Sequence, residues 1–279
     1  MAWEKAGDIL RDGKKNGYGV PAFNIFNYET IWFAVEAAER AGIPVLIEFY
    51  PGFRGFISLK QVAEITKDAA SRVKTPVGLH LDHCGDFDTL IQAMQAGFPS
   101  VMYDGSALPY EENAANTREV VKTAKALGID VEGELGHVGS AGKLEDFTDK
   151  SKYTEPTDAQ RFVEETGVSS LAIAVGNAHG PYAQAPVIDV PRIREASRLT
   201  GIPLVLHGGS GIPDDQVRQA VKAGICKMNV ATEYFAAYYR AIAGYMKEEH
   251  FTDMFAATKA VRPEIDKFLT YKLELMYKA

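Results

Sequence analysis

The chain is poor in cysteine and has no long apolar run, and each absence removes a class of protein. Only two cysteines, Cys84 and Cys226, occur in 279 residues. We therefore expect no disulfide framework, and we expect the protein to reside in a reducing compartment. No stretch approaches the ~20 consecutive apolar residues of a membrane span, and residues 1–20 hold no apolar run of signal-peptide length. We expect a cytoplasmic protein with no membrane partner.

Positive charge is also in deficit, with 30 lysines and arginines against 37 acidic residues and a net charge of −7. A nucleic-acid backbone requires a basic face, so we expect no nucleic-acid partner. An anionic small molecule remains compatible with this charge if positive groups or backbone N–H groups are gathered locally. The composition, 24% charged and 46% hydrophobic, is typical of a globular protein. No linker or low-complexity tract divides the chain, so residues 1–279 are expected to form one domain.

The chain contains a repeated sequence motif, in which a glycine suited to a helix end precedes a short run rich in Val and Ile. Six runs follow this pattern, among them "AGIPVLIEFY" from Ala41 and "TGIPLVLHGG" from Thr200. Two more apolar runs, "YGVPAFNI" from Tyr18 and "VGLHLDH" from Val77, complete eight expected strands. Segments of helical periodicity lie between them. Several open on a residue suited to a helix start, namely Asn27, Ser58, Asp86, Thr157 and Pro213.

Eight strands alternating with helices over about 250 residues predict an α/β protein with a closed (β/α)8 TIM barrel. A doubly wound open sheet is the alternative. The tail after His250 has helical character and exceeds what an eighth helix needs. We expect extra C-terminal helices that cover the barrel or reach a partner subunit. The connection 136–156, rich in Gly, Ser, Lys and Asp, is long enough to be a functional loop or a disordered one.

The unusual polar residues lie where such a barrel places its active site, at the C-terminal ends of the strands. His83, His179 and His207 end the third, sixth and seventh expected strands. A single strand-end histidine is more often structural, but three at one barrel mouth match a catalytic zinc site with an open position. Other polar residues also stand in or at the ends of expected strands: Asn24, Asp82, Asp104, Glu132, Glu134, Asn229 and Thr232.

The remaining histidines are expected elsewhere. His80 has the parity of Asp82 along its strand, which predicts an inward barrel residue and not a ligand. His137 begins the long loop and is not assigned to the site, and His250 is expected on the surface.

Two short segments suggest an anion site. "HGGSG" and "NVAT" each follow a strand and lead into a helix, where backbone N–H groups bind phosphate well. Either segment alone could be a simple turn. Together they match the loops after strands seven and eight, where barrels often hold phosphate.

Seven motifs occur in the order "PAFNI", "HLDH", "VMYDGS", "VEGELG", "GNAHGPY", "LHGGSGIP" and "KMNVATE", and the family match that they belong to covers about residues 7–245. The sequence resembles the class II, zinc-dependent ketose-bisphosphate aldolases, the family of fructose- and tagatose-bisphosphate aldolases. The resemblance implies reversible cleavage of a phosphorylated ketose to dihydroxyacetone phosphate and an aldehyde, through a zinc-stabilised enediolate. It also implies a homodimer or homotetramer.

The resemblance assigns a role to individual residues. His83, His179 and His207 would bind Zn²⁺, and Asp82 would be the acid/base beside the aldehyde oxygen. Asp104 and Glu134 would hold an alternate metal or orient the site. The substrate and its phosphate would be held, with a monovalent cation (Na⁺ or K⁺) nearby, by Asn24, Gly180, Gly208, Gly209, Ser210, Asn229 and Thr232.

The sequence departs from the family pattern mainly on the aldehyde side. The family's mobile loop usually carries Gly-Gly-(Glu/Gln)-(Glu)-Asp, whereas this chain has "GSAGKLEDF". Glu145 is therefore the candidate base and Asp146 the second choice. Cys84 and Ala183 stand where other residues are common. Arg54, in the unusual segment "EFYPGFRGF", is a candidate partner for an anionic far end of the substrate.

Two other functions are possible for a barrel with these motifs. A metal-dependent hydrolase would use a zinc-activated water, but it has no need of a dedicated phosphate site. A non-catalytic sugar-phosphate-binding protein would be expected to have lost a metal ligand or Asp82, and all are present.

Overall fold

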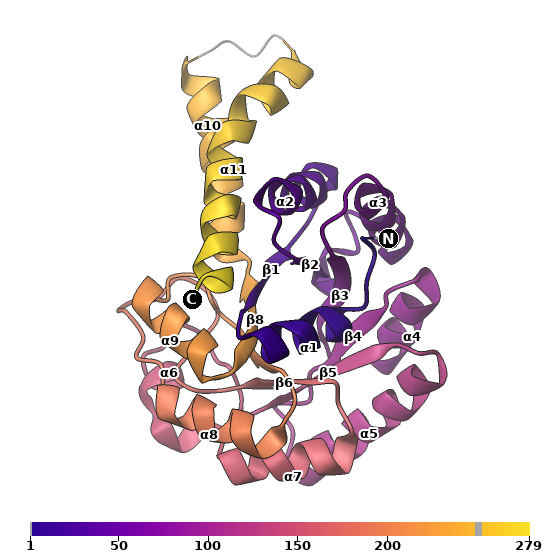
Figure 1. Ribbon diagram of the computed structural model, residues 1–279, viewed down its shortest axis with the longest axis vertical. Helices are drawn as coiled ribbons and strands as arrows, with labels where there is room; N and C mark the ends of the chain where they lie inside the picture. Colours follow the sequence, from indigo (N-terminus) through magenta and orange to yellow (C-terminus); the bar gives the residue numbers. More distant parts are fainter. Residues whose placement is uncertain (1, 249–252) are drawn as a thin grey trace.

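The computed structural model describes residues 2–248 and 253–279, and its centre is a closed barrel of parallel strands (Figure 1). Each strand pairs with the next along the chain, and β1 pairs with β8, which closes the ring. The predicted TIM barrel is confirmed and the open-sheet alternative is wrong. The strands are β1 (Val20–Asn24), β2 (Val45–Phe49), β3 (Val77–Cys84), β4 (Ser100–Tyr103), β5 (Asp130–Leu135), β6 (Ser170–Ile173), β7 (Leu204–Leu206) and β8 (Ile225–Val230).

Helices surround the barrel, and local signals fix most of their starts. Asn27 and Ser58 each form a capping box, and Asp86 caps its helix through the N–H of Thr89. Helix α1 (Ala6–Asn16) lies across one end of the barrel, against β1, β3 and β8 (Figure 1). The helices packed around the strands are α2 (Tyr28–Ala41), α3 (Leu59–Ser71), α4 (Phe87–Ala96), α5 (Tyr110–Ala126), α7 (Pro156–Thr166), α8 (Val190–Thr200) and α9 (Asp214–Ala223).

Two expected helix starts are shifted by one residue. Helix α7 begins at Pro156, ahead of Thr157, because the fixed φ of proline suits the first helical position. Pro213 is the N-cap of α9, which begins at Asp214. Neither shift moves a strand end.

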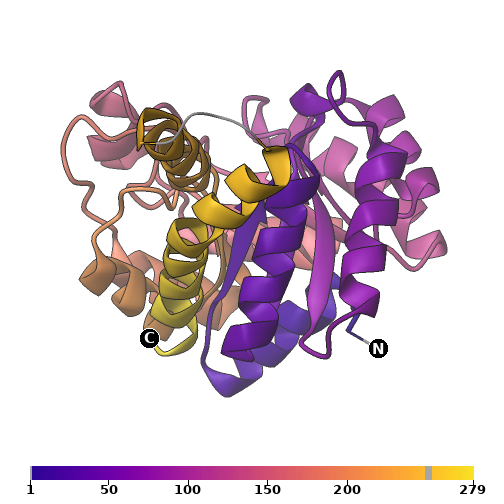
Figure 2. The ribbon, with the colours of Figure 1, turned by 90° about the horizontal axis from the view of Figure 1, so that it is seen from above.

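The chain ends in two long helices, α10 (Thr232–Glu248) and α11 (Met254–Tyr277), that pack against each other. Their far ends project beyond the barrel as an arm (Figure 1). The middle of α11 lies beside α2 (Figure 2), and its residues Val261, Ile265 and Leu269, at four-residue spacing, are buried. Arg262 stacks over the Trp32 ring at 4.7 Å and pairs with Glu36. The extra C-terminal helices are thus confirmed, and part of α11 covers the barrel. His250 lies outside the described residues.

Two further expectations can be compared with the structure. Cys84 and Cys226 are both buried and unpaired, as expected for a chain without a disulfide framework. Among the helices of the described residues, none combines the length and apolar character needed to cross a bilayer.

A buried ion cluster lies inside the barrel. The Lys227 ammonium is 2.6 Å from Glu48 Oε1 and 2.7 Å from Glu132 Oε2, and all three side chains are almost wholly buried. His80 lies next to them and contacts Ser100 Oγ through Nδ1 at 2.7 Å, so its predicted inward position is confirmed. This cluster lies next to the strand-end residues, since Glu132 also accepts a hydrogen bond from His207.

Lys227→Met should destabilise the protein strongly, because it leaves two buried carboxylates without their cation. Breaking a buried pair from one side typically costs about 3–5 kcal/mol. Urea unfolding followed by circular dichroism measures the loss, and exposed Lys222→Met on α9 is the matched control. Equal unfolding midpoints for the two variants would contradict the structural role of Lys227.

Candidate active site

A cavity of about 470 Å³ opens at the C-terminal ends of the strands. Its lining comes from strand ends around most of the barrel and from the first turn of α10. Its lining residues form three groups. A cluster of imidazoles and carboxylates lies in the middle, glycines and hydroxyls after β6 to β8 lie at one part of the wall, and aromatic rings form another.

A backbone irregularity brings Asp82 and His83 to the cavity together. Adjacent residues of a regular strand point to opposite faces. The β3–β4 pairing shifts register between Leu81 and Cys84, and His83 has φ +42°, the only positive φ of a non-glycine residue in the described chain. Such a conformation costs of order 1–3 kcal/mol. The bulge re-aims the His83 ring so that both side chains line the cavity.

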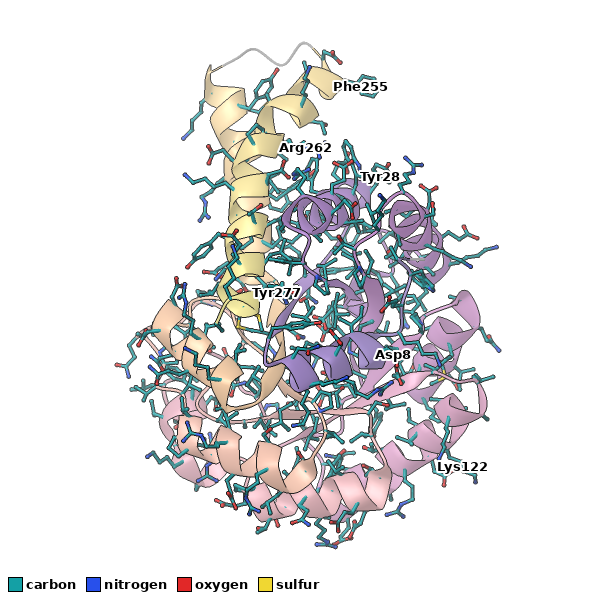
Figure 3. All side chains as sticks on the ribbon, in the orientation of Figure 1. Asp8, Tyr28, Lys122, Phe255, Arg262 and Tyr277 are labelled. Atoms are coloured by element: carbon teal, nitrogen blue, oxygen red, sulfur yellow. The ribbon has the colours of Figure 1, made fainter. Side chains whose placement is uncertain are left out.

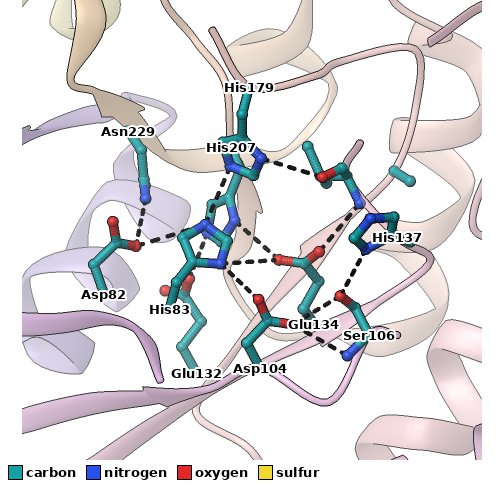
Figure 4. A network of polar contacts seen from close by, with 12 residues as sticks. Asp82, His83, Asp104, Ser106, Glu132, Glu134, His137, His179, His207 and Asn229 are labelled. Atoms are coloured by element: carbon teal, nitrogen blue, oxygen red, sulfur yellow. Dashed lines mark hydrogen bonds and ion pairs between the residues drawn. The ribbon is translucent and has the colours of Figure 1, made fainter. Parts of the chain in front are cut away.

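His83, His179 and His207 lie together, each offering a ring nitrogen within 4.8 Å of the others (Figure 4). The second nitrogen of each ring donates to a different acceptor. His83 Nδ1–H donates to Asp104 Oδ2 (2.8 Å), His179 Nδ1–H to the Val138 carbonyl (3.1 Å) and His207 Nε2–H to Glu132 Oε1 (2.9 Å). In the neutral form of each ring, these bonds fix the tautomer and leave the lone pair of the other nitrogen facing the cluster.

The cluster has the properties of a cation site. His83 Nε2 and His179 Nε2 are only 3.1 Å apart, so their two lone pairs need a shared proton or cation between them. His207 Nδ1 and Glu134 Oε2 are buried without a hydrogen-bond partner, although they lie 3.0 Å apart. The donor set therefore fits a divalent metal bound by three imidazoles. A second set, His83, Asp104 and Glu134, is equally compact.

The charges around the cluster also favour a bound cation. Burial opposes protonation of His207, but the carboxylates of Glu132 and Glu134 outweigh it and raise its pKa to about 10. The site thus favours positive charge beside these carboxylates. Burial and the neighbouring imidazoles lower the pKa of His179 to about 4, so this ring is neutral and available as a ligand near pH 7.

Asp82 is held by two amides. Asn24 Nδ2 donates to Asp82 Oδ2 at 2.7 Å, and Asn229 Nδ2 donates to Oδ1 at 2.9 Å. Burial would raise the pKa of Asp82, but the charges of His83, His207 and Lys227 and the bond from Asn24 outweigh it and lower the pKa. The family resemblance assigns both asparagines to substrate. The structure gives their amide groups to Asp82, while both residues still line the cavity.

The predicted phosphate residues gather after β6, β7 and β8. Gly180, Gly208, Ser210 and Thr232 line the cavity with Asn229. Gly208 has φ +62°, and a Cβ there would collide with the Ala178 carbonyl. Gly209 is not among the lining residues, and its N–H already donates to the Asn229 carbonyl. Ser210 Oγ accepts from the Glu233 N–H (3.2 Å) at the start of α10.

The long loop contains a short helix, α6 (Glu145–Thr148), and a 3₁₀ turn, η2 (Lys150–Lys152). Glu145 is exposed and is not among the residues that line the cavity. Asp146 accepts from the Ser140 N–H and the Lys152 ammonium, each at 3.0 Å, so it braces the loop. Phe147 is buried against the Tyr182 ring.

His137, which the sequence did not assign to the site, lines the cavity. Its Nδ1 lies 3.2 Å from Ser106 Oγ, and the Ser106 hydroxyl donates to Asp104 Oδ1 at 2.7 Å (Figure 4). Arg54, which the sequence did assign, is exposed, donates to Thr89 and is not a lining residue. Tyr50 and Phe53 from the same connection line the cavity in its place.

Comparison with known proteins identifies the family. The sequence model described as fructose-bisphosphate aldolase class-II matches residues 4–279. The crystal structure of the YdjI aldolase from Escherichia coli K12 is 32% identical, with a TM-score of 0.88 over 98% of this chain and 97% of that one. Fructose-bisphosphate aldolase from Campylobacter jejuni, 22% identical, shares the fold with a TM-score of 0.84 over 99% of this chain and 95% of that one. The family resemblance found in the motifs is confirmed, and the chain belongs to the class II fructose-bisphosphate aldolase family.

Proposed function

We propose that residues 1–279, as one domain, catalyse reversible aldol cleavage of a phosphorylated ketose to dihydroxyacetone phosphate and an aldehyde, with Zn²⁺ as cofactor. One observation carries this proposal. His83 and His179, an ionised Asp82 and a glycine-lined wall face one cavity, and the third imidazole of the cluster, His207, is buried next to them. Zinc bound by His83, His179 and His207 would act as a Lewis acid that stabilises negative charge on the substrate.

Asp82 performs the proton transfer at the oxygen that becomes the aldehyde. Its lowered pKa keeps the carboxylate ionised, so in cleavage it accepts the proton of the substrate hydroxyl. In synthesis the same carboxyl group returns that proton to the aldehyde oxygen. The amides of Asn24 and Asn229 hold both carboxylate oxygens and orient the acid. Asp104 orients the His83 ring through its 2.8 Å bond.

Glu145 is the base that removes the proton from the reacting carbon of dihydroxyacetone phosphate and returns it. Because its side chain is exposed on the loop 136–156, it reaches the substrate only when this loop closes over the cavity. Asp146 is the weaker candidate, since its carboxylate is already bonded to Ser140 and Lys152.

The reaction class has a direct test. The zinc-loaded protein should convert dihydroxyacetone phosphate and glyceraldehyde into a ketose phosphate, detected by mass spectrometry. A chelator should stop the reaction and added zinc should restore it. Release of inorganic phosphate without a new carbon–carbon bond would favour the hydrolase, and binding without turnover would favour a sugar-phosphate-binding protein.

Ser210→Ala should weaken binding of dihydroxyacetone phosphate by about 1.5–3 kcal/mol, the range for a hydrogen bond to a charged group. Ser210 lines the cavity beside the first turn of α10. Affinity for dihydroxyacetone, which lacks the phosphate, should barely change. Calorimetric titration of both ligands checks this. Equal losses of binding free energy for the two ligands would show that Ser210 does not contact the phosphate.

We also propose a homodimer or homotetramer that uses the arm of α10 and α11. Large apolar side chains are exposed along it, with Tyr239 at 58%, Met246 at 51% and Phe255 at 77%. Phe255 lies at the far end of the arm (Figure 3). The exposure of several large apolar side chains on one projecting arm supports a contact surface there. Light scattering after gel filtration should give two or four times the 30.5 kDa chain mass, and a monomer would contradict this proposal.

A further inference from the structure

We infer that the aldehyde half of the substrate is uncharged, so that the natural substrate is a ketose 1-monophosphate and not a ketose bisphosphate. This inference rests on the proposed aldolase function and specifies its substrate class. It comes from the charges and shapes of the cavity wall.

With the loop 136–156 in its present position, the cavity wall offers a second phosphate no cationic partner. Among the described residues that line it there is no lysine or arginine, and residues 1 and 249–252 contain none either. Two cationic groups from neighbouring segments do not line the cavity. Lys227 is bound between Glu48 and Glu132 inside the barrel, and the Arg54 guanidinium donates to Thr89.

The two parts of the wall differ in chemistry. After β6 to β8, the cavity has glycine backbone and the hydroxyls of Ser210 and Thr232, which suit one phosphate. The segment after β2 and the first turn of α10 contribute Tyr50, Phe53 and Phe235 instead. A phosphate placed on these rings would lose water without gaining a hydrogen-bonding partner.

The aromatic residues form a continuous wall. Ring centroids are 5.6 Å apart for Tyr50 and Phe53, and 6.0 Å apart for Phe53 and Phe235. Phe26 supports Phe235 from behind at 5.1 Å. Rings at these separations are packed against each other. The wall therefore presents a firm apolar surface to the carbon chain of a bound aldehyde.

The acidic side chains in the cavity oppose a second anion as well. Asp82 and Asp104 both line it, so a second phosphate placed there would face their carboxyl oxygens. Juxtaposed like charges cost several kcal/mol at a desolvated site. An uncharged aldehyde avoids this cost and still buries its carbon chain on the aromatic wall.

The test keeps dihydroxyacetone phosphate constant and varies the aldehyde on the zinc-loaded protein. Lactaldehyde and glyceraldehyde should each give kcat/KM values at least about 100-fold above that of glyceraldehyde 3-phosphate. Equal or higher efficiency with glyceraldehyde 3-phosphate would overturn the inference. No ketose phosphate from any of the three aldehydes would instead remove the proposed function.

Variants of the wall separate its role from folding. Phe53→Ala should lower kcat/KM for lactaldehyde by about 10- to 100-fold, the scale of a lost apolar contact in a pocket. Phe56→Ala is the matched control, because Phe56 lies in the same connection but is 87% exposed and is not a lining residue. Phe53→Arg should raise the relative efficiency with glyceraldehyde 3-phosphate. An unchanged aldehyde preference in both Phe53 variants would contradict the role of the wall.

Discussion

His83→Ala, His179→Ala and His207→Ala should each lose most of the bound metal and nearly all activity. Each ring is held by its own acceptor, Asp104, Val138 or Glu132, so none can move to replace a missing neighbour. Loss of a single outer-shell partner typically costs 10- to 100-fold in metal affinity or activity, and loss of a ligand should exceed about 100-fold. Metal content after dialysis, measured by mass spectrometry, and turnover are the two readouts.

His137→Ala is the control for metal content, because His137 lines the same cavity but does not belong to the cluster. It should retain zinc. Full zinc occupancy with normal turnover in any of the three ligand variants would contradict the ligand set. If the metal instead occupies His83, Asp104 and Glu134, then Glu134→Gln should lose it while His179→Ala keeps it.

Asp82→Ala and Glu145→Ala should fail at different steps, and each loss should be about 10²- to 10⁴-fold, the usual contribution of a positioned acid or base. Asp82 is fixed beside His83 by the strand and by two amides. Its loss should abolish carbon–carbon cleavage and formation while proton exchange at carbon continues. Glu145→Ala should bind zinc and substrate and lose that exchange.

Both variants are compared in deuterated buffer, where proton magnetic resonance follows exchange and a coupled assay follows cleavage. Lys143→Ala is a matched control for the loop, since Lys143 is likewise exposed there and carries no proposed role. Exchange at the parent rate in Glu145→Ala would show that another group is the base. His137 would then be the next residue to replace, because it already lines the cavity.

The strands and most helix starts could be predicted because their signals are local. Apolar runs fix the strands, and the side chains of Asn27, Ser58 and Asp86 bond backbone groups only a few residues away. The gathering of three histidines followed from the barrel rule that strand ends meet at one mouth. That rule places residues at the mouth but gives no side-chain direction.

The features that escaped prediction depend on distances across the mouth or on backbone irregularity. Strand parity sends His83 away from Asp82, and only the bulge with φ +42° reverses this. The bonds from Asn24 and Asn229 to Asp82 join residues 58 and 147 positions from Asp82 in the chain. Arg54 donates to Thr89, which is 35 positions away in the chain. The sequence does not show which of several possible partners such a long side chain contacts.

Hydrogen–deuterium exchange in dihydroxyacetone phosphate alone tests the central claim most directly, because it needs no knowledge of the aldehyde. Incubated with the zinc-loaded protein in deuterated buffer, the ligand should lose one of the two protons on the carbon that forms the new bond. Exchange should cease when a chelator removes the metal and return when zinc is added. No exchange at the reacting carbon, or exchange that is unchanged by the chelator, would contradict a metal-dependent aldolase.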